Sequence, residues 1–103
     1  MIMKIVELTA QTIRVEHPEA SYGIFCFNSA GDLFLSSDWG FYAYAWRAFG
    51  EDFGAFLASC NTEYIVGKFA ITYAEVARKN LPKLNTQKLT QLVDAFREVL
   101  KTK

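Results

Sequence analysis

The sequence has few of the residues around which reactive sites are usually built. It contains one histidine and two cysteines among 103 residues. Two cysteines are too few for a disulfide-rich scaffold, and the separation of Cys26 and Cys60 does not match a zinc or redox motif. A glycine-rich phosphate-binding loop is also absent. We therefore expect a reduced, intracellular protein with no metal site and no cofactor.

The sequence also lacks an excess of charge of one sign and a long hydrophobic run. Eleven Lys and Arg residues balance eleven Asp and Glu residues, so net charge does not indicate a nucleic acid or an anionic membrane as partner. The longest wholly apolar stretch is residues 41–46, far shorter than the roughly 20 residues that span a bilayer. Glu7 interrupts the apolar run that a signal peptide would need. These absences predict a soluble, cytoplasmic protein that makes no membrane contact.

The residues that are present are typical of one globular domain spanning 1–103. Hydrophobic residues make up 51% and charged residues 21%. Residues 1–60 hold three basic and seven acidic side chains, whereas residues 61–103 hold eight basic and four acidic ones. Fifteen of the 16 aromatic residues lie between Tyr22 and Tyr73. We expect residues 1–48 to be mainly β and 50–103 mainly α. Because the first half of the chain is acidic and the second half basic, two copies could also associate with each other.

Short apolar or alternating segments predict an antiparallel meander in the first half. Residues 12–16 alternate apolar and polar side chains, as a half-buried strand does. Residues 22–27 and 33–36 flank a loop rich in turn-forming residues, which predicts a hairpin. Residues 41–46 follow a second turn at 37–40, and residues 2–8 are one more candidate strand. The meander therefore has four or five strands.

The second half carries the signals of three or four helices. Two carboxylates at 51–52 stand where a helix amino terminus favours them, before a short apolar helix that starts at Phe53. Residues 62–69 fit a short helix capped by Asn61 or Thr62, or a strand, because the pair at 65–66 is β-branched.

Clearer helix signals follow along the chain. A capping-box pattern at 72–75 predicts a helix over 73–80, which Pro82 ends. Asn85 caps a final helix whose apolar residues, from Leu89 to Leu100, repeat every 3.6 positions. Helices that follow strands indicate an α+β fold, with the helices packed on one face of the sheet.

Candidate catalytic groups are few, and each has an ordinary structural explanation. His17 stands in a turn with no Ser or Cys motif around it. Cys60 follows a predicted helix, and Cys26 lies in a strand, where a free cysteine usually acts as a small apolar residue. The spacing of the acidic residues in turns and at helix ends matches no known metal loop; these are Asp32, Asp38, Glu51 and Asp52. We assign no catalytic residue.

The aromatic segment at 41–46 is the strongest candidate for a binding site. Strand alternation places the aromatic rings at 42, 44 and 46 on one face, and Phe41 with two alanines on the other. An outward aromatic face would bind a protein or stack on unpaired bases, whereas an inward one would form the core, which is the commoner arrangement. The candidate binding residues, including those of the preceding turn, are Asp38, Trp39, Tyr42, Tyr44 and Trp46.

Basic residues surround the predicted turn at Pro82, with no acidic residue between Glu75 and Asp94. Such a cluster suits a contact with phosphate groups or with an acidic protein, although a solvated corner between two helices is the commoner explanation. We call this cluster the basic corner; its members are Arg78, Lys79, Lys83 and Lys88.

Residues 36–68 carry a motif of widely spaced aromatic and small residues. It begins with Ser-Ser-Asp-Trp-Gly at 36–40 and continues through the alternating aromatics at 42–46. Gly50, Phe53 and the pair Phe56-Leu57 follow, and the motif ends with Tyr64 and Lys68. The motif resembles a group of small uncharacterised proteins encoded by phages, prophages and related mobile elements. The resemblance implies an accessory protein of a mobile element, and it assigns no activity and no site residue.

These observations leave three hypotheses for the function. The first is a non-enzymatic module that binds a protein through its aromatic strand or its acidic first half. The second is a nucleic-acid binder that uses the basic corner together with aromatic stacking. The third is a small enzyme that uses Cys60 with His17, or a pair of carboxylates.

Overall fold

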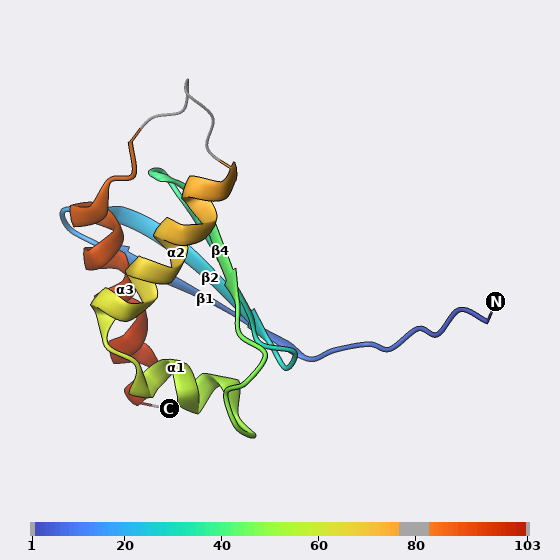
Figure 1. Cartoon of the computed structure of the whole chain (residues 1–103). Helices are drawn as coiled ribbons and strands as arrows, with labels where there is room; N and C mark the ends of the chain where they lie inside the picture. Colours follow the sequence, from blue (N-terminus) through green and yellow to red (C-terminus); the bar gives the residue numbers. More distant parts are fainter. Residues whose placement is uncertain (1, 77–82, 103) are drawn as a thin grey trace.

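A four-stranded antiparallel sheet lies against three helices in the computed structural model, which describes residues 2–76 and 83–102 (Figure 1). The strands are β1 (Ala10–His17), β2 (Ser21–Asn28), β3 (Asp32–Ser37) and β4 (Gly40–Ala45), in the order β1-β2-β3-β4. The helices are α1 (Phe53–Ser59), α2 (Thr62–Val76) and α3 (Thr86–Lys101). The predicted α+β arrangement is confirmed. Within the described ranges it has four strands rather than five, and three helices rather than four.

The turn between β2 and β3 is fixed by one side chain and one glycine. The Asn28 Oδ1 atom accepts hydrogen bonds from the backbone N–H groups of Ala30 (2.9 Å) and Asp32 (3.1 Å). Gly31 has a φ of 97°, and a Cβ atom there would lie 2.0 Å from the backbone oxygen of Trp46. The Gly31 carbonyl accepts a hydrogen bond from the Trp46 N–H (2.8 Å). The turn therefore also anchors the chain just beyond β4.

The core lies between the sheet and the helices. Phe96 of α3 stacks on Phe25 of β2, with ring centroids 4.1 Å apart and an angle of 4° between the ring planes. The predicted apolar face of α3 is buried, and comprises Leu89, Leu92, Val93, Phe96 and Leu100. The Asn85 side chain accepts a hydrogen bond from the Lys88 N–H (3.1 Å), which confirms the predicted cap of this helix.

Residues 2–8 form no strand, contrary to the sequence prediction. The Thr9 carbonyl still accepts a hydrogen bond from the Ser29 N–H (3.0 Å), and Ala10 pairs with Asn28. Because β2 ends at Asn28 and the chain turns to β3, none of the strands in the described residues lies alongside residues 2–8 to pair with them. They extend away from the domain on the side opposite the helices (Figure 1). We call residues 2–9 the arm.

The helix that was expected to start at residue 73 is the last part of the longer helix α2. The Asn61 side chain caps the start of α2 by accepting a hydrogen bond from the Tyr64 N–H (2.7 Å). Ile65 and Val66 are buried against the domain, so tertiary packing overrides their preference for a strand. The capping box at 72–75 starts no helix because the preceding residues are already helical.

The remaining part of that expectation falls outside the described residues. The helix was predicted over 73–80, with Pro82 ending it. Residues 77–80 and Pro82 lie outside the described ranges. Of the helices that the structure does describe, none combines the length and apolar character needed to cross a bilayer.

Candidate functional site

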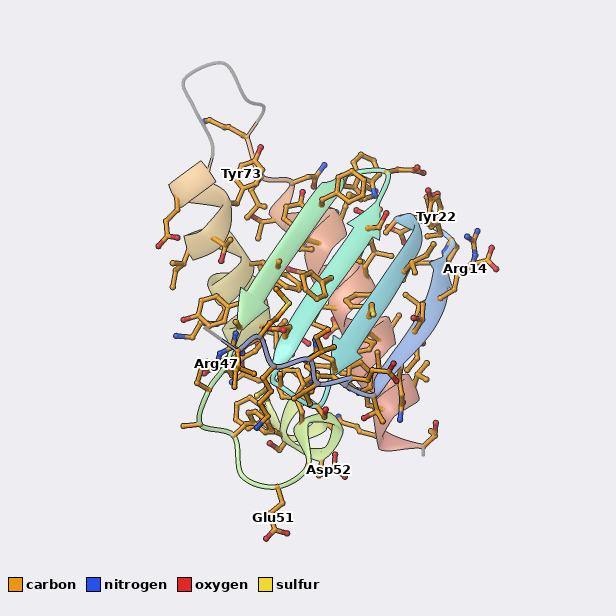
Figure 2. All side chains as sticks on the ribbon, turned by 90° about the vertical axis from the view of Figure 1, so that its right-hand side faces the viewer. Arg14, Tyr22, Arg47, Glu51, Asp52 and Tyr73 are labelled. Carbon is orange, nitrogen blue, oxygen red and sulfur yellow. The ribbon has the colours of Figure 1, made fainter. Side chains whose placement is uncertain are left out.

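The two faces of the sheet have different surroundings. The three helices pack on one face (Figure 1), and Figure 2 shows the opposite face, which none of the described helices covers. Because side chains alternate along a strand, Phe25, Leu35 and Tyr42 point toward the helices and are buried. Their neighbours in sequence point the other way. We call this other side the open face.

Two rows of side chains cross the open face. Strand register aligns four residues in each row, namely Thr12, Cys26, Phe34 and Ala43, and then Arg14, Ile24, Ser36 and Phe41. Phe41 is 81% exposed and Phe34 is 48% exposed. Apolar side chains come mainly from β2 to β4, whereas β1 contributes polar and charged ones. The open face therefore has an apolar half over β2–β4 and a polar half over β1.

The polar half is occupied by interactions within the chain. The Arg14 guanidinium lies 4.4 Å from the ring centroid of Tyr22 and forms an ion pair with Glu16 (4.0 Å). Figure 2 shows Arg14 and Tyr22 together at the β1 edge of the sheet. Exposed pairs of this kind contribute little to stability, but they keep this half of the face hydrated.

The apolar half carries a hollow of about 400 Å³. Ile24, Cys26, Phe34 and Phe41 contribute to its wall, which continues to Tyr73 of α2. Figure 2 places Tyr73 at the β4 side of the sheet. A hollow with mainly aliphatic and aromatic walls suits apolar side chains rather than a phosphate or a metal ion.

The predicted aromatic positions 42 and 46 lie on the helix side of β4. Tyr42 is 4% exposed and Trp46 is 6% exposed. The Tyr42 ring packs 6.0 Å from Phe69, and its hydroxyl donates a hydrogen bond to the Trp39 carbonyl (2.5 Å). Burial raises the pKa of the Tyr42 hydroxyl. Both rings are part of the core here, so a contact between them and a partner stays a prediction.

The later residues of the phage-protein motif meet in space. Trp46 donates a hydrogen bond from Nε1 to the Tyr64 hydroxyl (3.1 Å), and its ring lies edge-on to Tyr44, 4.8 Å away. The Lys68 ammonium lies 5.3 Å from the ring centroids of both Tyr44 and Tyr64. Cation–π and ring contacts thus join the end of β4 to α2. In this chain the cluster brings the later aromatic residues of the motif into contact with its lysine.

The predicted binding residues Asp38 and Trp39 join the turns at one end of the sheet. The Asp38 carboxylate accepts a hydrogen bond from the Ser21 hydroxyl (2.7 Å), and Trp39 Nε1 donates to the Ala20 carbonyl (2.8 Å). The Lys88 ammonium lies 5.7 Å from the Trp39 ring centroid. Trp39 is half-buried and Asp38 is exposed, so only the carboxylate is readily accessible. A role for either residue in binding a partner stays a prediction.

The basic corner is only partly within the described residues. Arg78 and Lys79 lie outside them, and Lys83 is exposed just before α3. The Lys88 ammonium donates a hydrogen bond to the Glu19 carbonyl (2.8 Å). This cation is therefore already engaged by the turn between β1 and β2.

The candidate catalytic groups show no activated arrangement. The His17 Nδ1 atom accepts a hydrogen bond from the Glu19 N–H (3.0 Å) within its own turn. The hollow beside His17 is lined by residues of β1, β2 and their turn, and does not include Cys60. Cys60 follows α1, and burial raises the pKa of its thiol, with Arg97 acting in the opposite direction. A raised pKa disfavours the thiolate that nucleophilic catalysis requires.

The carboxylates predicted as possible acid–base or metal groups have local partners. The Asn28 amide holds the pKa of Asp32 below its usual value, burial opposes this effect, and Arg47 forms an ion pair with Asp32 (3.0 Å). Asp52 accepts the Ala55 N–H (3.1 Å) as the cap of α1. Glu51 points into solvent (Figure 2). Within residues 2–76 and 83–102, no three His, Cys, Asp or Glu side chains converge as a metal site.

The sequence pattern does not identify the apolar half of the open face as a surface. The alternation at 41–46 already separated Phe41 from Tyr42, but periodicity does not show which side the helices cover. Phe34 was not identified as exposed, because its strand reads as a continuous apolar run. The signal that could have found this surface is an unusually large number of apolar side chains on both faces of one short meander.

Comparison with known proteins supports the relationship suggested by the motif. A phage family model, Phage_phiTE_072, matches residues 3–98. The comparisons found no match among curated proteins and none among solved structures. The expectation of a small phage-associated protein is confirmed at the level of the family, because the match spans almost the entire chain. The chain belongs to this phage protein family.

Proposed function

We propose that this phage-family protein is a non-enzymatic module that binds another protein through the apolar half of its open face. The observation that carries the proposal is the exposed ring of Phe41 beside Phe34 and the hollow. Large apolar side chains grouped on the surface of a folded domain mark interaction sites more often than single ones do. Aromatic side chains next to a pocket are also the usual anchors of protein interfaces.

The nucleic-acid hypothesis has less support. The chain has no net charge, and the ammonium of Lys88 is already bound by a backbone carbonyl. The aromatic rings at 42 and 46, which would have stacked on bases, are buried. The exposed rings of the open face are Phe34 and Phe41, and the residues around them are mainly apolar rather than basic.

The test is affinity capture from a lysate of host cells that also produce the untagged chain, with and without nuclease, so that any host or phage partner is present. Three baits are compared: the unchanged chain, Phe41→Lys, and Ser59→Lys. Ser59 is exposed at the end of α1, on the helix side, so its variant adds the same charge away from the open face. Circular dichroism of each bait serves as the check that it is folded.

We expect the unchanged chain and Ser59→Lys to retain the same protein after nuclease treatment, and Phe41→Lys to lose it. Desolvating a lysine against apolar walls is unfavourable, which is why the substitution removes the contact. Retention that is equal for all three baits would place the interface elsewhere. Retention that disappears with nuclease would instead favour nucleic-acid binding.

A further inference from the structure

The arm exposes more apolar surface than any other segment of the described chain. Its five large apolar side chains are all at least half exposed, namely Ile2 (95%), Met3 (81%), Ile5 (82%), Val6 (62%) and Leu8 (52%). Exposed apolar groups of this size in water are unfavourable unless something covers them. The family match starts at residue 3, so nearly all of the arm lies within the matched region.

The arm has the composition of a strand, but it pairs with none of the described strands. Three of its residues are β-branched aliphatics, Ile2, Ile5 and Val6, which favour extended backbone. The Thr9 carbonyl is held by Ser29, so the direction in which the arm leaves the sheet is fixed. No Gly, Pro, Asn or Asp occurs in residues 2–9, so the arm lacks the residues that a sharp reversal onto its own sheet would need.

The arm and the apolar half of the open face lie on the same side of the molecule. Figure 1 shows the arm leaving the sheet opposite the helices, and the open face is the side of the sheet that it leaves from. Both are apolar, and the structure leaves both uncovered. One additional molecule that offers the same two elements can cover all of this surface at once.

We infer that the partner is a second copy of this chain, with each arm lying along the hollow of the other copy. This inference rests on the proposed function, because it assigns an occupant to the same surface. Two open faces related by a twofold axis would place each arm across its partner, which is the closed arrangement that most homodimers adopt.

The dimensions agree with this arrangement. The three strands of the apolar half, spaced about 4.8 Å apart with about six residues each, present roughly 300 Å² in each copy. An extended arm of eight residues is about 26 Å long and, at about 10 Å wide with its side chains, covers roughly 260 Å² of that surface. Two arms and the two surfaces beneath them therefore bury about 1,000 Å², near the lower end of specific interfaces. The arms contribute about half of this buried area.

The first measurement is the mass of the full chain by multi-angle light scattering over a dilution series. We expect a dimer that dissociates on dilution. Ile5→Glu in the arm and Phe41→Lys on the open face are each expected to raise the dissociation constant at least about tenfold. Ser59→Lys is the matched control and leaves the constant unchanged. Both test positions are more than four-fifths exposed in the single chain, so the variants should fold.

The second measurement shows which chain the arm contacts. Cys26 is part of the wall of the hollow and carries a free thiol. The variant Ile5→Cys with Cys60→Ser leaves one thiol in the arm and one in the hollow. Diamide then oxidises the two thiols to a disulfide if they meet. We expect a product of twice the chain mass on a non-reducing gel, formed between Cys26 of one copy and position 5 of the other.

Three other results would overturn the inference. A crosslink within one chain would show that the arm covers its own open face. A chain that stays monomeric without any crosslink, but captures a protein that Phe41→Lys loses, would leave the proposed function standing and remove the second copy as partner. A dimer that neither Ile5→Glu nor Phe41→Lys weakens would show that the chain self-associates through another surface.

Discussion

Removing the Phe96 ring should destabilise the domain more than any change on the open face. Phe96 is fully buried, stacks on Phe25 at 4.1 Å, and meets Phe27 edge-on at 5.9 Å. Truncating a buried phenylalanine to alanine typically costs about 3–5 kcal/mol of unfolding free energy, including the lost ring contacts. Small domains have only about 5–15 kcal/mol in total, so Phe96→Ala would leave the protein close to unfolding at room temperature.

The assay is urea unfolding followed by circular dichroism, together with a thermal melt. Phe96→Ala is expected to lower the melting temperature by roughly 15–30 °C. The matched control is Phe41→Ala, which removes the same ring from an 81% exposed position and, at a protein concentration where the chain is monomeric, should change stability by less than about 0.5 kcal/mol. If the two variants were equally destabilised, the assignment of the covered and open faces would be refuted. A loss below about 1.5 kcal/mol for Phe96→Ala would show that the ring stack is not central to the core.

Three further predictions concern a turn, an acid group and a thiol. Gly31→Ala should lower the free energy of unfolding by about 2 kcal/mol or more, because the new Cβ atom would sit at a positive φ and clash with the backbone oxygen of Trp46. Gly50→Ala also has a positive φ but meets open space, so it should lower the free energy of unfolding by less. Equal losses for the two variants in urea unfolding would contradict this reasoning. The Asn28 amide favours the charged form of Asp32, so this carboxylate stabilises the fold above its ordinary pKa of 3.8 and loses that effect as the pH falls through its lowered folded value. Asp32→Asn should therefore weaken the pH dependence of stability between pH values of about 2 and 5, and unchanged acid unfolding would contradict the argument. Because burial raises the pKa of Cys60, its alkylation by iodoacetamide at neutral pH should be slower in the folded chain than in urea, measured by peptide mapping; equal rates would show that the thiol is not protected.

Much of the fold could be predicted because its signals are local. The loop at 28–32 has the residues that its hydrogen bonds and positive φ require, so the hairpin between β2 and β3 is visible in the sequence. The same holds for the cap at Asn85 and for the apolar stripe of α3. Each of these features depends on residues within a few positions of one another.

The features that were missed depend on distant parts of the chain. Residues 2–8 have the composition of a strand, but composition shows a tendency and not whether a partner strand exists. α2 continues through the capping box at 72–75, where the half-buried Tyr73 packs against Tyr42 with ring centroids 5.8 Å apart. At this position tertiary contacts override the local signal for the start of a helix.

The candidate site could be predicted only to the level of a strand. Alternation separated Phe41 from Tyr42, and both possible orientations were consistent with the sequence. The choice between them is made by α2 and α3, whose apolar faces cover the side that holds Tyr42 and Phe25. Which face of a sheet becomes a surface is decided by elements that come later in the chain.

The order of the strands has a consequence for synthesis on the ribosome. Each strand pairs with its neighbour in sequence, so the meander can form as soon as β4 has emerged. Its apolar inner face stays partly uncovered until α3 is made, because Phe96 of α3 is the residue that stacks on Phe25 of β2. During that interval the nascent sheet exposes both this surface and the apolar half of its open face, and is prone to aggregate. Chaperones that hold nascent chains should therefore contact this protein until its last helix docks.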